Sequence, residues 1–284
     1  FFQILNTKFF ICKISSVSKM RILLTNDDGI YSSGLKAAYE ALSEIADVTV
    51  VAPITQMSAV GRSISIMRPV RISKVDIDGI KIFAVDGTPT DCVVLGIYKV
   101  IRDVPDLTVC GINLGENLST EAITTSGTVC AALEAATRGS VAIAISLELP
   151  DVNKFVLNCN YDFGFAKKVL KWVVKKVKIG LPSGIDLLNV NVPTKPNGKV
   201  KVTKLAKRMY KINIEERIDP RGREYYWIQG TKVTNAEDGT DIHALRKGYV
   251  SITPLSIDLT SKNLDEIAKL LEGRIGSNDA RSSR

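Results

Sequence analysis

The sequence predicts an α/β protein with a Rossmann-like, doubly wound and mainly parallel sheet, followed by a β-rich and helical C-terminal elaboration. Two observations support this fold class. Over residues 20–149, short apolar runs of strand length alternate with longer segments of helical spacing, as in successive β-α-β units with right-handed crossovers. Beyond Pro150 this alternation stops, and extended segments rich in basic and aromatic residues follow.

The first half opens with a short apolar run at 21–25, which is typical of a buried parallel strand. A helix is expected at 34–45, because apolar residues recur there at intervals of three and four. Further strands are expected at 47–52, 107–110 and 142–147, a hairpin at 70–74 and 80–85, and helices at 89–102 and 126–139.

The helix at 89–102 has the clearest start signal of these elements. Thr88 suits the N-cap, Pro89 suits the first helical position, and Asp91 suits the reciprocal position of a capping box. The spacing therefore predicts a helix that begins at Pro89.

The second half is expected to extend the sheet and to provide subunit contacts. Its predicted elements are a helix at 163–177, strands at 187–192, 200–216, 225–231 and 249–254, and a final helix at 261–271. The predicted organisation is an N-terminal extension (1–19), a core with the active site (20–150), an elaboration with an oligomerisation arm (151–275) and a polar tail (276–284).

Composition narrows the class of protein. The 284 residues are 45% hydrophobic, enough for one large domain or a domain with an appendage. The net charge of +8 is compatible with partners that carry phosphate, although a solvated basic face is the favoured explanation. The 19 residues before Met20 are too short an apolar piece to span a bilayer and lack a signal-peptide pattern, so a disordered or loosely docked arm is expected.

Cysteine and histidine usage excludes several kinds of site. The five cysteines are odd in number and form no CxxC pair, which argues against a zinc site and a disulfide framework and favours a reducing, cytoplasmic setting. The single histidine, His243, excludes His-rich metal sites and is expected to be structural.

The turn directly after the first strand carries two adjacent carboxylates, Asp27 and Asp28, within an NDDG sequence. A dinucleotide-binding protein would place glycines at this position, so that backbone amides could approach a pyrophosphate. Adjacent like charges repel, and that cost is tolerated when a cation bridges them or when one carboxyl is protonated. A simple Asx-turn that caps the next helix is the other interpretation of the same four residues.

Three loops should meet at the carboxyl edge of the predicted sheet, at 26–33, 54–65 and 111–128. Their candidate metal ligands all donate oxygen, which favours Mg²⁺ or Mn²⁺ over zinc. These candidates are Asp27, Asp28, Ser58 and Asn113. The Ser126-Gly127-Thr128 sequence at a helix start offers backbone amides and two hydroxyls for an anion. Carboxylates for a cation beside amides for an anion indicate a metal-assisted phosphohydrolase.

Seven ordered motifs, spread over residues 20–271, resemble the SurE survival-protein family. They are NDDG at 26–29, the serine-rich loop with Ser58, GTPTDC at 87–92, GINLGEN at 111–117, SGTV at 126–129, DPRG at 219–222 and GYVSITPL at 248–255. The resemblance implies a Rossmann-like core, one divalent metal ion per subunit and hydrolysis of nucleoside monophosphates. It also implies a dimer or tetramer assembled through the C-terminal half, with the last helix often exchanged.

The resemblance assigns roles to single residues. It places the metal on Asp27, Asp28, Ser58 and Asn113, and the phosphate on Asn117, Ser126, Gly127 and Thr128. The residues expected to act in catalysis are Asp27, Asp28 and Asn117, with Asp27 orienting or deprotonating the attacking water. Gly61, Ser63, Gly111 and Gly115 are expected in the substrate pocket. Tyr31 and Thr125 depart from the family pattern, in which His and Tyr are common.

Together these features predict a phosphohydrolase that removes phosphate from nucleoside 5′- and 3′-monophosphates by attack of a metal-activated water. Other phosphate esters and polyphosphate are further candidate substrates. The alternative is a non-catalytic nucleotide- or nucleic-acid-binding α/β module that uses the same edge of the sheet, which the charge of +8 permits. A dehydrogenase-type domain is disfavoured because the glycine fingerprint is missing.

Overall fold

The fold was taken from a computed structural model that describes residues 19–150, 161–233 and 235–272. The strands are β1 (Arg21–Thr25), β2 (Asp47–Pro53), β3 (Ile72–Ile77), β4 (Ile80–Val85), β5 (Leu107–Leu114), β6 (Val141–Leu147), β7 (Leu187–Val192), β8 (Val200–Val202), β9 (Tyr210–Ile218), β10 (Glu224–Lys232) and β11 (Val250–Leu255). The helices are α1 (Ser33–Ser43), α2 (Pro89–Leu95), the π-helix η1 (Gly96–Ile101), α3 (Ser119–Thr125), α4 (Gly127–Thr137), α5 (Gly164–Val177), α6 (Asp241–Arg246) and α7 (Leu264–Leu271).

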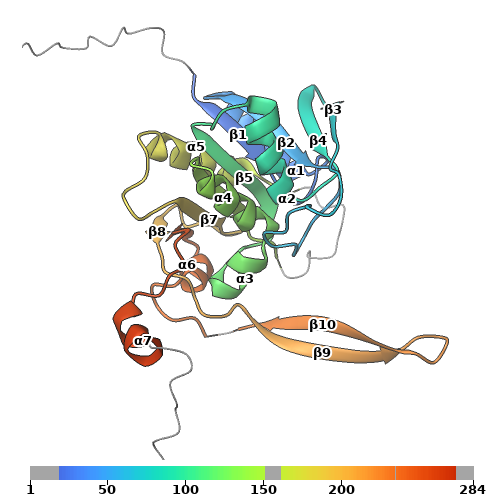
Figure 1. The fold of residues 1–284 in the computed structure, drawn as a ribbon, viewed down its shortest axis with the longest axis vertical. Helices are drawn as coiled ribbons and strands as arrows, with labels where there is room; N and C mark the ends of the chain where they lie inside the picture. The colour runs from blue at the N-terminus through green and yellow to red at the C-terminus, as the bar shows by residue number, and fades with distance from the viewer. Residues whose placement is uncertain (1–18, 151–160, 234, 273–284) are drawn as a thin grey trace, which may run out of the picture.

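One nine-stranded sheet forms the centre of the molecule, in the order β3-β4-β2-β1-β5-β6-β7-β11-β8 (Figure 1). The six strands from β4 to β7 in this order are mutually parallel. The two strands that pair antiparallel to this block are β3, on β4, and β11, on β7. The predicted α/β class with a mainly parallel sheet is therefore confirmed.

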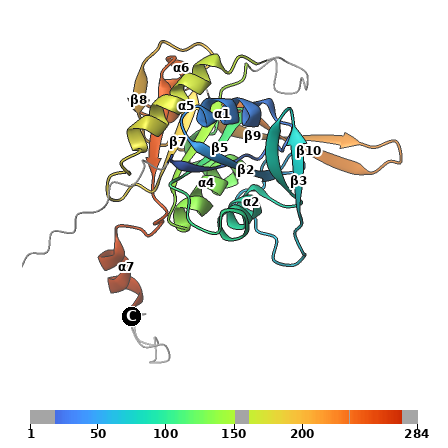
Figure 2. The same cartoon turned by 90° about the horizontal axis from the view of Figure 1, so that it is seen from above.

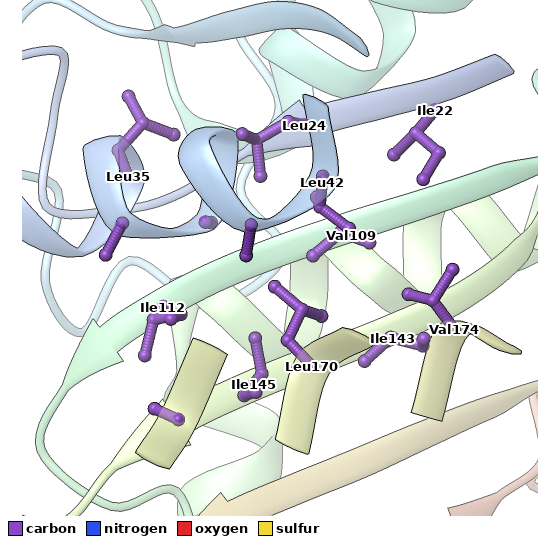
Figure 3. Close-up of a cluster of buried hydrophobic side chains, with 14 of the residues drawn as sticks. Ile22, Leu24, Leu35, Leu42, Val109, Ile112, Ile143, Ile145, Leu170 and Val174 are labelled. Carbon is purple, nitrogen blue, oxygen red and sulfur yellow. The ribbon is translucent and has the colours of Figure 1, made fainter. Parts of the chain in front are cut away.

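Helices cover both faces of the sheet: α1 and α5 lie on one side and α2 and α4 on the other (Figure 2). Figure 3 shows the first of these layers, where Leu35 of α1 and Leu170 of α5 pack over strand residues such as Leu24 and Ile145. Along β1, Leu24 belongs to this cluster and its neighbour Leu23 to the cluster on the opposite face. Burial on both faces explains why the central strands are continuous apolar runs.

The order of the strands in the sheet indicates where a ligand can bind. From β1 the chain leads to β2 on one side, whereas β5 flanks β1 on the other side. In doubly wound sheets, ligands bind outside the carboxyl ends of the strands where the strand order reverses. The turn at 26–29 leaves β1 at such a point, beside the end of β5.

Several element boundaries differ from the predictions. The strand predicted at 107–110 continues to Leu114 after a register shift between Cys110 and Asn113, so Asn113 pairs with Ser146 inside the sheet. The hairpin strand predicted at 70–74 lies at Ile72–Ile77. The helix predicted at 89–102 is confirmed, with its capping box at Thr88, but continues from α2 into η1. Two short helices, α3 and α6, were not predicted.

The C-terminal half extends the sheet through β7, β11 and β8 and sends out a separate two-stranded sheet, β9–β10, which we call the arm (Figures 1 and 2). The DPRG sequence forms the turn at its tip, where the amide of Gly222 donates to the carbonyl of Asp219. Helix α7 has no buried residue and stands away from the sheet.

The division of the chain at residue 150 stays a prediction. The segment 1–18, the tail from 273 and two of the five cysteines, Cys12 and Cys159, lie outside the described residues. No helix in the described part of the chain combines the length and the apolar character that a membrane-spanning helix needs.

Candidate functional site

A pocket of about 400 Å³ lies at the carboxyl edge of the sheet, at the switch point between β1 and β5. Five segments form its wall: the turn after β1, the loop that follows β2, the chain from Asn113 to Ser126, Leu149 after β6, and the base of the arm. Seven residues predicted for the site line it together, namely Asp27, Asp28, Ser58, Asn113, Gly115, Asn117 and Ser126. A second hollow, of about 410 Å³, lies beside α1, but its charged residues Lys36 and Asp78 pair with each other.

Asp27 is only 4% exposed and lies against the first turn of α4. Its carboxylate accepts a hydrogen bond from the hydroxyl of Thr128 and is hydrogen-bonded by the backbone amides of Gly127 and Thr128. The approach is close enough that a Cβ at position 127 would lie 2.7 Å from the Cβ of Asp27, so the sequence requires glycine there. Burial raises the pKa of Asp27, and the hydrogen bonds from α4 oppose that rise.

Asp28 lies beside it and is half-buried. Burial, followed by repulsion from Asp27, raises the pKa of Asp28 to about 7, against hydrogen bonds from Leu114 and Gln56 that lower it. The backbone amide of Leu114 donates to Asp28 Oδ2 over 3.3 Å. Two adjacent carboxylates at this depth are unfavourable in their ionised form unless a positive charge lies near them.

Ser58 and Asn113 face the same pocket from two other loops. The hydroxyl of Ser58 accepts a hydrogen bond from Gln56 Nε2 at 3.1 Å. The side-chain amide of Asn113 donates to the carbonyl of Gly115 at 2.7 Å, and its oxygen is the part of that side chain left to bind a cation. Within the described residues no group of three His, Cys, Asp or Glu side chains could hold a metal, so any metal here depends on these neutral oxygen donors as well.

The charge of the pocket wall fits a divalent cation. Three of the lining residues are acidic, Asp27, Asp28 and Glu116, and none of the described residues on the wall is Lys, Arg or His. Glu116 is itself paired with Lys232 of the arm at 2.9 Å. The remaining carboxylates have raised pKa values and hard oxygen donors around them, which is the environment that Mg²⁺ or Mn²⁺ prefers.

The residues predicted to bind phosphate fall into two groups. Asn117 and Ser126 line the pocket, and the hydroxyl of Ser126 accepts the amide of Val129, which makes it the N-cap of α4. Gly127 and Thr128 lie behind Asp27 and direct their amides to its carboxylate. The helix start that was predicted to receive an anion therefore receives the Asp27 carboxylate.

The residues predicted for the substrate pocket are also divided. Gly115 lies on the wall, whereas Gly61, Ser63 and Gly111 do not. The amide of Gly61 donates to the carbonyl of Thr125 at 2.9 Å, and the carbonyl of Ser63 accepts the hydroxyl of Thr88 at 2.7 Å. These contacts hold the Ser58 loop in place, and contact of Gly61, Ser63 and Gly111 with a substrate stays a prediction.

The sequence analysis missed several lining residues, above all those at the base of the arm. Met209 and Tyr210 reach the pocket from about 90 residues further along the chain than Asn117, and no local pattern marks them. Of the two departures from the family pattern, Thr125 lies on the wall and Tyr31 does not. His243 lies in α6 and pairs with Asp238 at 2.9 Å, away from the pocket wall.

Comparison with known proteins gives consistent results. Residues 22–212 match the family model described as survival protein SurE. A 5′-nucleotidase SurE of Archaeoglobus fulgidus is 67% identical over 243 residues, which are 85% of this chain and 93% of that protein. A 5′-nucleotidase SurE of Methanococcoides burtonii is 50% identical and covers 88% of this chain and 99% of its own length. The crystal structure of the SurE protein from Aquifex aeolicus, 40% identical, superposes with a TM-score of 0.76 over 89% of this chain and 100% of that one.

Proposed function

The chain belongs to the survival protein SurE family and is an enzyme of the 5′-nucleotidase class, and we propose that it hydrolyses nucleoside 5′- and 3′-monophosphates with one divalent cation in the pocket at β1 and β5. The resemblance predicted from the seven motifs is thereby confirmed. The identity of the metal, the residue roles and the range of substrates belong to the proposal.

The charge of the pocket wall is the observation that supports a bound metal ion. It bears acidic residues and, among the described residues, no basic one, although the substrate is itself an anion. Asp27 and Asp28 would repel a phosphate group at close range. A cation bound between carboxylates and phosphate removes that repulsion and attracts both groups, which protonation of a carboxyl does not do, so the wall favours a bound cation.

Asp27, Asp28, Ser58 and Asn113 would hold the cation, as Mg²⁺ or Mn²⁺. When bound, the cation polarises a phosphoryl oxygen and lowers the pKa of water. Asp27 is the residue suited to orient the attacking water and to take its proton, because Thr128 and the amides of α4 fix the direction of its carboxylate.

The other lining residues bind the substrate in this proposal. Asn117 and Ser126 donate hydrogen bonds to phosphoryl oxygens from the amide and the hydroxyl that they direct to the pocket wall. Leu149, Met209 and Tyr210 form an apolar part of the wall, which suits the nucleoside. Other phosphate esters and polyphosphate are further candidate substrates.

The assembly belongs to the proposal as well. We expect a homodimer or homotetramer formed through the arm and the C-terminal segment, because the arm exposes large apolar residues such as Ile214 and Ile228. A cytoplasmic location is proposed from the cysteines: Cys92, Cys110 and Cys130 are free thiols in buried positions.

The direct test is release of inorganic phosphate from AMP and GMP. We expect release with Mg²⁺ or Mn²⁺, loss of release after treatment with EDTA, and recovery when either metal is added back. Adenosine serves as the blank. Binding of AMP that resists EDTA, without release of phosphate, would instead identify a non-catalytic nucleotide-binding module.

A further inference from the structure

Two asparagines lie buried in the middle of the sheet, on β7. This strand reads LLNVNV, and both Asn189 and Asn191 are 0% exposed. A strand at this position, between β6 and β11, is normally apolar on both faces. Burial of a side-chain amide costs free energy unless hydrogen bonds satisfy it. Two buried asparagines on one central strand therefore indicate specific hydrogen-bond partners.

Both side chains point to one residue of the pocket wall, Asn117. Asn191 Oδ1 accepts the backbone N–H of Asn117 at 2.8 Å, and Asn191 Nδ2 donates to the backbone carbonyl of Asn117 at 3.0 Å. Asn189 Nδ2 donates to the same carbonyl at 2.8 Å. The Asn117 side chain in turn donates to the hydroxyl of Ser146, another residue that is 0% exposed, at 2.9 Å.

Asn117 needs this support because the sheet no longer holds the chain there. The last backbone contact with β6 before it is the amide of Gly115, which donates to the carbonyl of Leu147 at 2.9 Å. Beyond Asn117, the amide of Ser119 donates to the buried carboxylate of Asp241, in α6, at 2.7 Å. Between these points, Asn191 pairs with both backbone groups of Asn117 as a neighbouring strand would.

We propose that Asn189 and Asn191 are positioning residues of the phosphate subsite, which hold Asn117 so that its side-chain amide meets the phosphate. The inference rests on the proposed function of Asn117. An amide NH₂ carries two donors, and Ser146 takes one of them, which leaves the second for an oxygen of the phosphate. Because hydrogen bonds hold both the backbone and the side chain of Asn117, this residue loses little conformational freedom when phosphate binds.

A purely structural role is the competing explanation, and the chain offers a matched control for it. Thr108 of β5 is also a buried polar residue of the sheet, 0% exposed, with its hydroxyl 2.8 Å from that of Ser140. It does not line the pocket, and its strand neighbours are Leu23 and Ala142. Thr108→Val therefore removes a buried hydrogen bond from the same sheet without touching Asn117, Asn189 or Asn191.

The experiment measures the affinity of inorganic phosphate by calorimetry with the Mn²⁺-loaded protein, together with kcat and KM for AMP and the melting temperature. Asn191→Leu is expected to weaken phosphate binding about tenfold or more and to raise KM, since a hydrogen bond to a charged group is lost. Mn²⁺ affinity should change less than about twofold, because Asn191 is not among the proposed metal ligands. Thr108→Val should lower the melting temperature with phosphate affinity unchanged.

A double-mutant cycle decides whether Asn191 acts through Asn117. In the Asn117→Ala background, Asn191→Leu should cause little further loss of phosphate affinity. A full loss in that background overturns the proposal, as does an Asn191→Leu variant with normal phosphate affinity and a lowered melting temperature. If Asn191→Leu does not fold, Asn191→Ser carries the same expectation. A wild-type protein that binds phosphate but releases none from AMP contradicts the proposed function, and the cycle still tests the positioning.

Discussion

The pocket wall and the arm depart from the usual distribution of polarity in opposite directions. At the pocket, polar groups are buried: Asp27 is 4% exposed and Asn191 is 0% exposed. On the arm, apolar groups are exposed: Ile214 is 55% exposed and Ile228 is 78% exposed. Buried polar residues and exposed apolar patches are the two informative departures in a folded chain. In the proposal, the buried polar groups serve a bound ligand and the exposed apolar groups serve a subunit contact.

The two regions are also built differently. The pocket brings together residues far apart in sequence, as in the contact of Asn117 with Asn191. The arm is made by nine local pairs of residues between β9 and β10. Its register places Ile214 opposite Ile228 on one face and Asn213 opposite Gln229 on the other. An isolated two-stranded hairpin is only marginally stable in water, so the apolar face needs a cover.

The largest effect is expected at the pocket, from Asp27→Asn. The amide keeps the size of the side chain but can neither take a proton nor bind a cation as a carboxylate does, so kcat/KM for AMP should fall by about 10³-fold or more. The melting temperature should change little or rise, because the burial that raises the pKa of Asp27 penalises its charge. The measurement is phosphate release with saturating Mn²⁺.

Asp76→Asn is the matched control for this variant. Asp76 accepts the amide of Gly79 in the exposed turn between β3 and β4, so the same chemical change is made far from the pocket. The control should keep wild-type kcat/KM. Near-normal activity of Asp27→Asn would show that the polar burial at the pocket serves packing rather than catalysis.

The second effect is expected on the arm, from the cross-strand pair Ile214→Thr with Ile228→Thr. Threonine keeps the β-branched shape that strands favour but removes apolar surface. Burial of a large apolar side chain stabilises by about 2 kcal/mol, so the pair should weaken association by roughly 10³-fold per protomer. Light scattering should show a shift from the oligomer towards the 31.0 kDa chain.

The opposite face of the arm supplies the control, Asn213→Thr with Gln229→Thr. This pair lies at the neighbouring register position and changes no large apolar residue. It should leave the oligomeric mass unchanged. If both double variants assemble like the wild type, the exposed isoleucines do not form the subunit contact. The exposed apolar face of the arm would then not mark a protein interface.

Much of the fold could be predicted because its signals are local. Buried parallel strands are apolar runs, and the capping box of Thr88 is a matter of spacing within four residues. The position of Asp27 and Asp28 followed from their place directly after the first strand. The short helices α3 and α6, of seven and six residues, were missed because too few turns exist for an apolar period to show.

The remaining part of the site depends on tertiary contacts that leave no local pattern. In LLNVNV, alternation of Asn with Val suggests a strand with one solvated face, yet both asparagines are fully buried beside Asn117. Asn113 was expected in a loop and lies in β5, because a register shift lengthens that strand. Met209, next to the start of the arm in sequence, lines the pocket although it is about 90 residues from Asn117. Each of these placements is decided by a contact between distant segments.

The smallest expected effect concerns how each region responds to pH in the metal-free protein. Burial, followed by the charge of Asp27, raises the pKa of Asp28 from 3.8 to about 7. The folded protein therefore binds more protons than the unfolded chain between these values, and stability falls as pH rises from about 4 to about 7. Asp28→Asn removes this penalty and should gain roughly 2–4 kcal/mol at pH 8, as each pKa unit corresponds to about 1.4 kcal/mol.

Urea unfolding of EDTA-treated protein from pH 5 to pH 8 measures this difference, and Asp219→Asn on the arm is its control. Hydrogen bonds from Arg223 lower the pKa of Asp219, so its charge favours the folded state rather than opposing it. This ion pair lies at the surface of the arm, where such pairs contribute little to stability. Mn²⁺ should remove most of the difference between wild type and Asp28→Asn, since a cation stabilises the paired carboxylates that protons otherwise neutralise. Equal stability of wild type and Asp28→Asn at pH 8 without metal would mean that the acidic pair is not strained by its burial, and the case for a cation there would weaken with it.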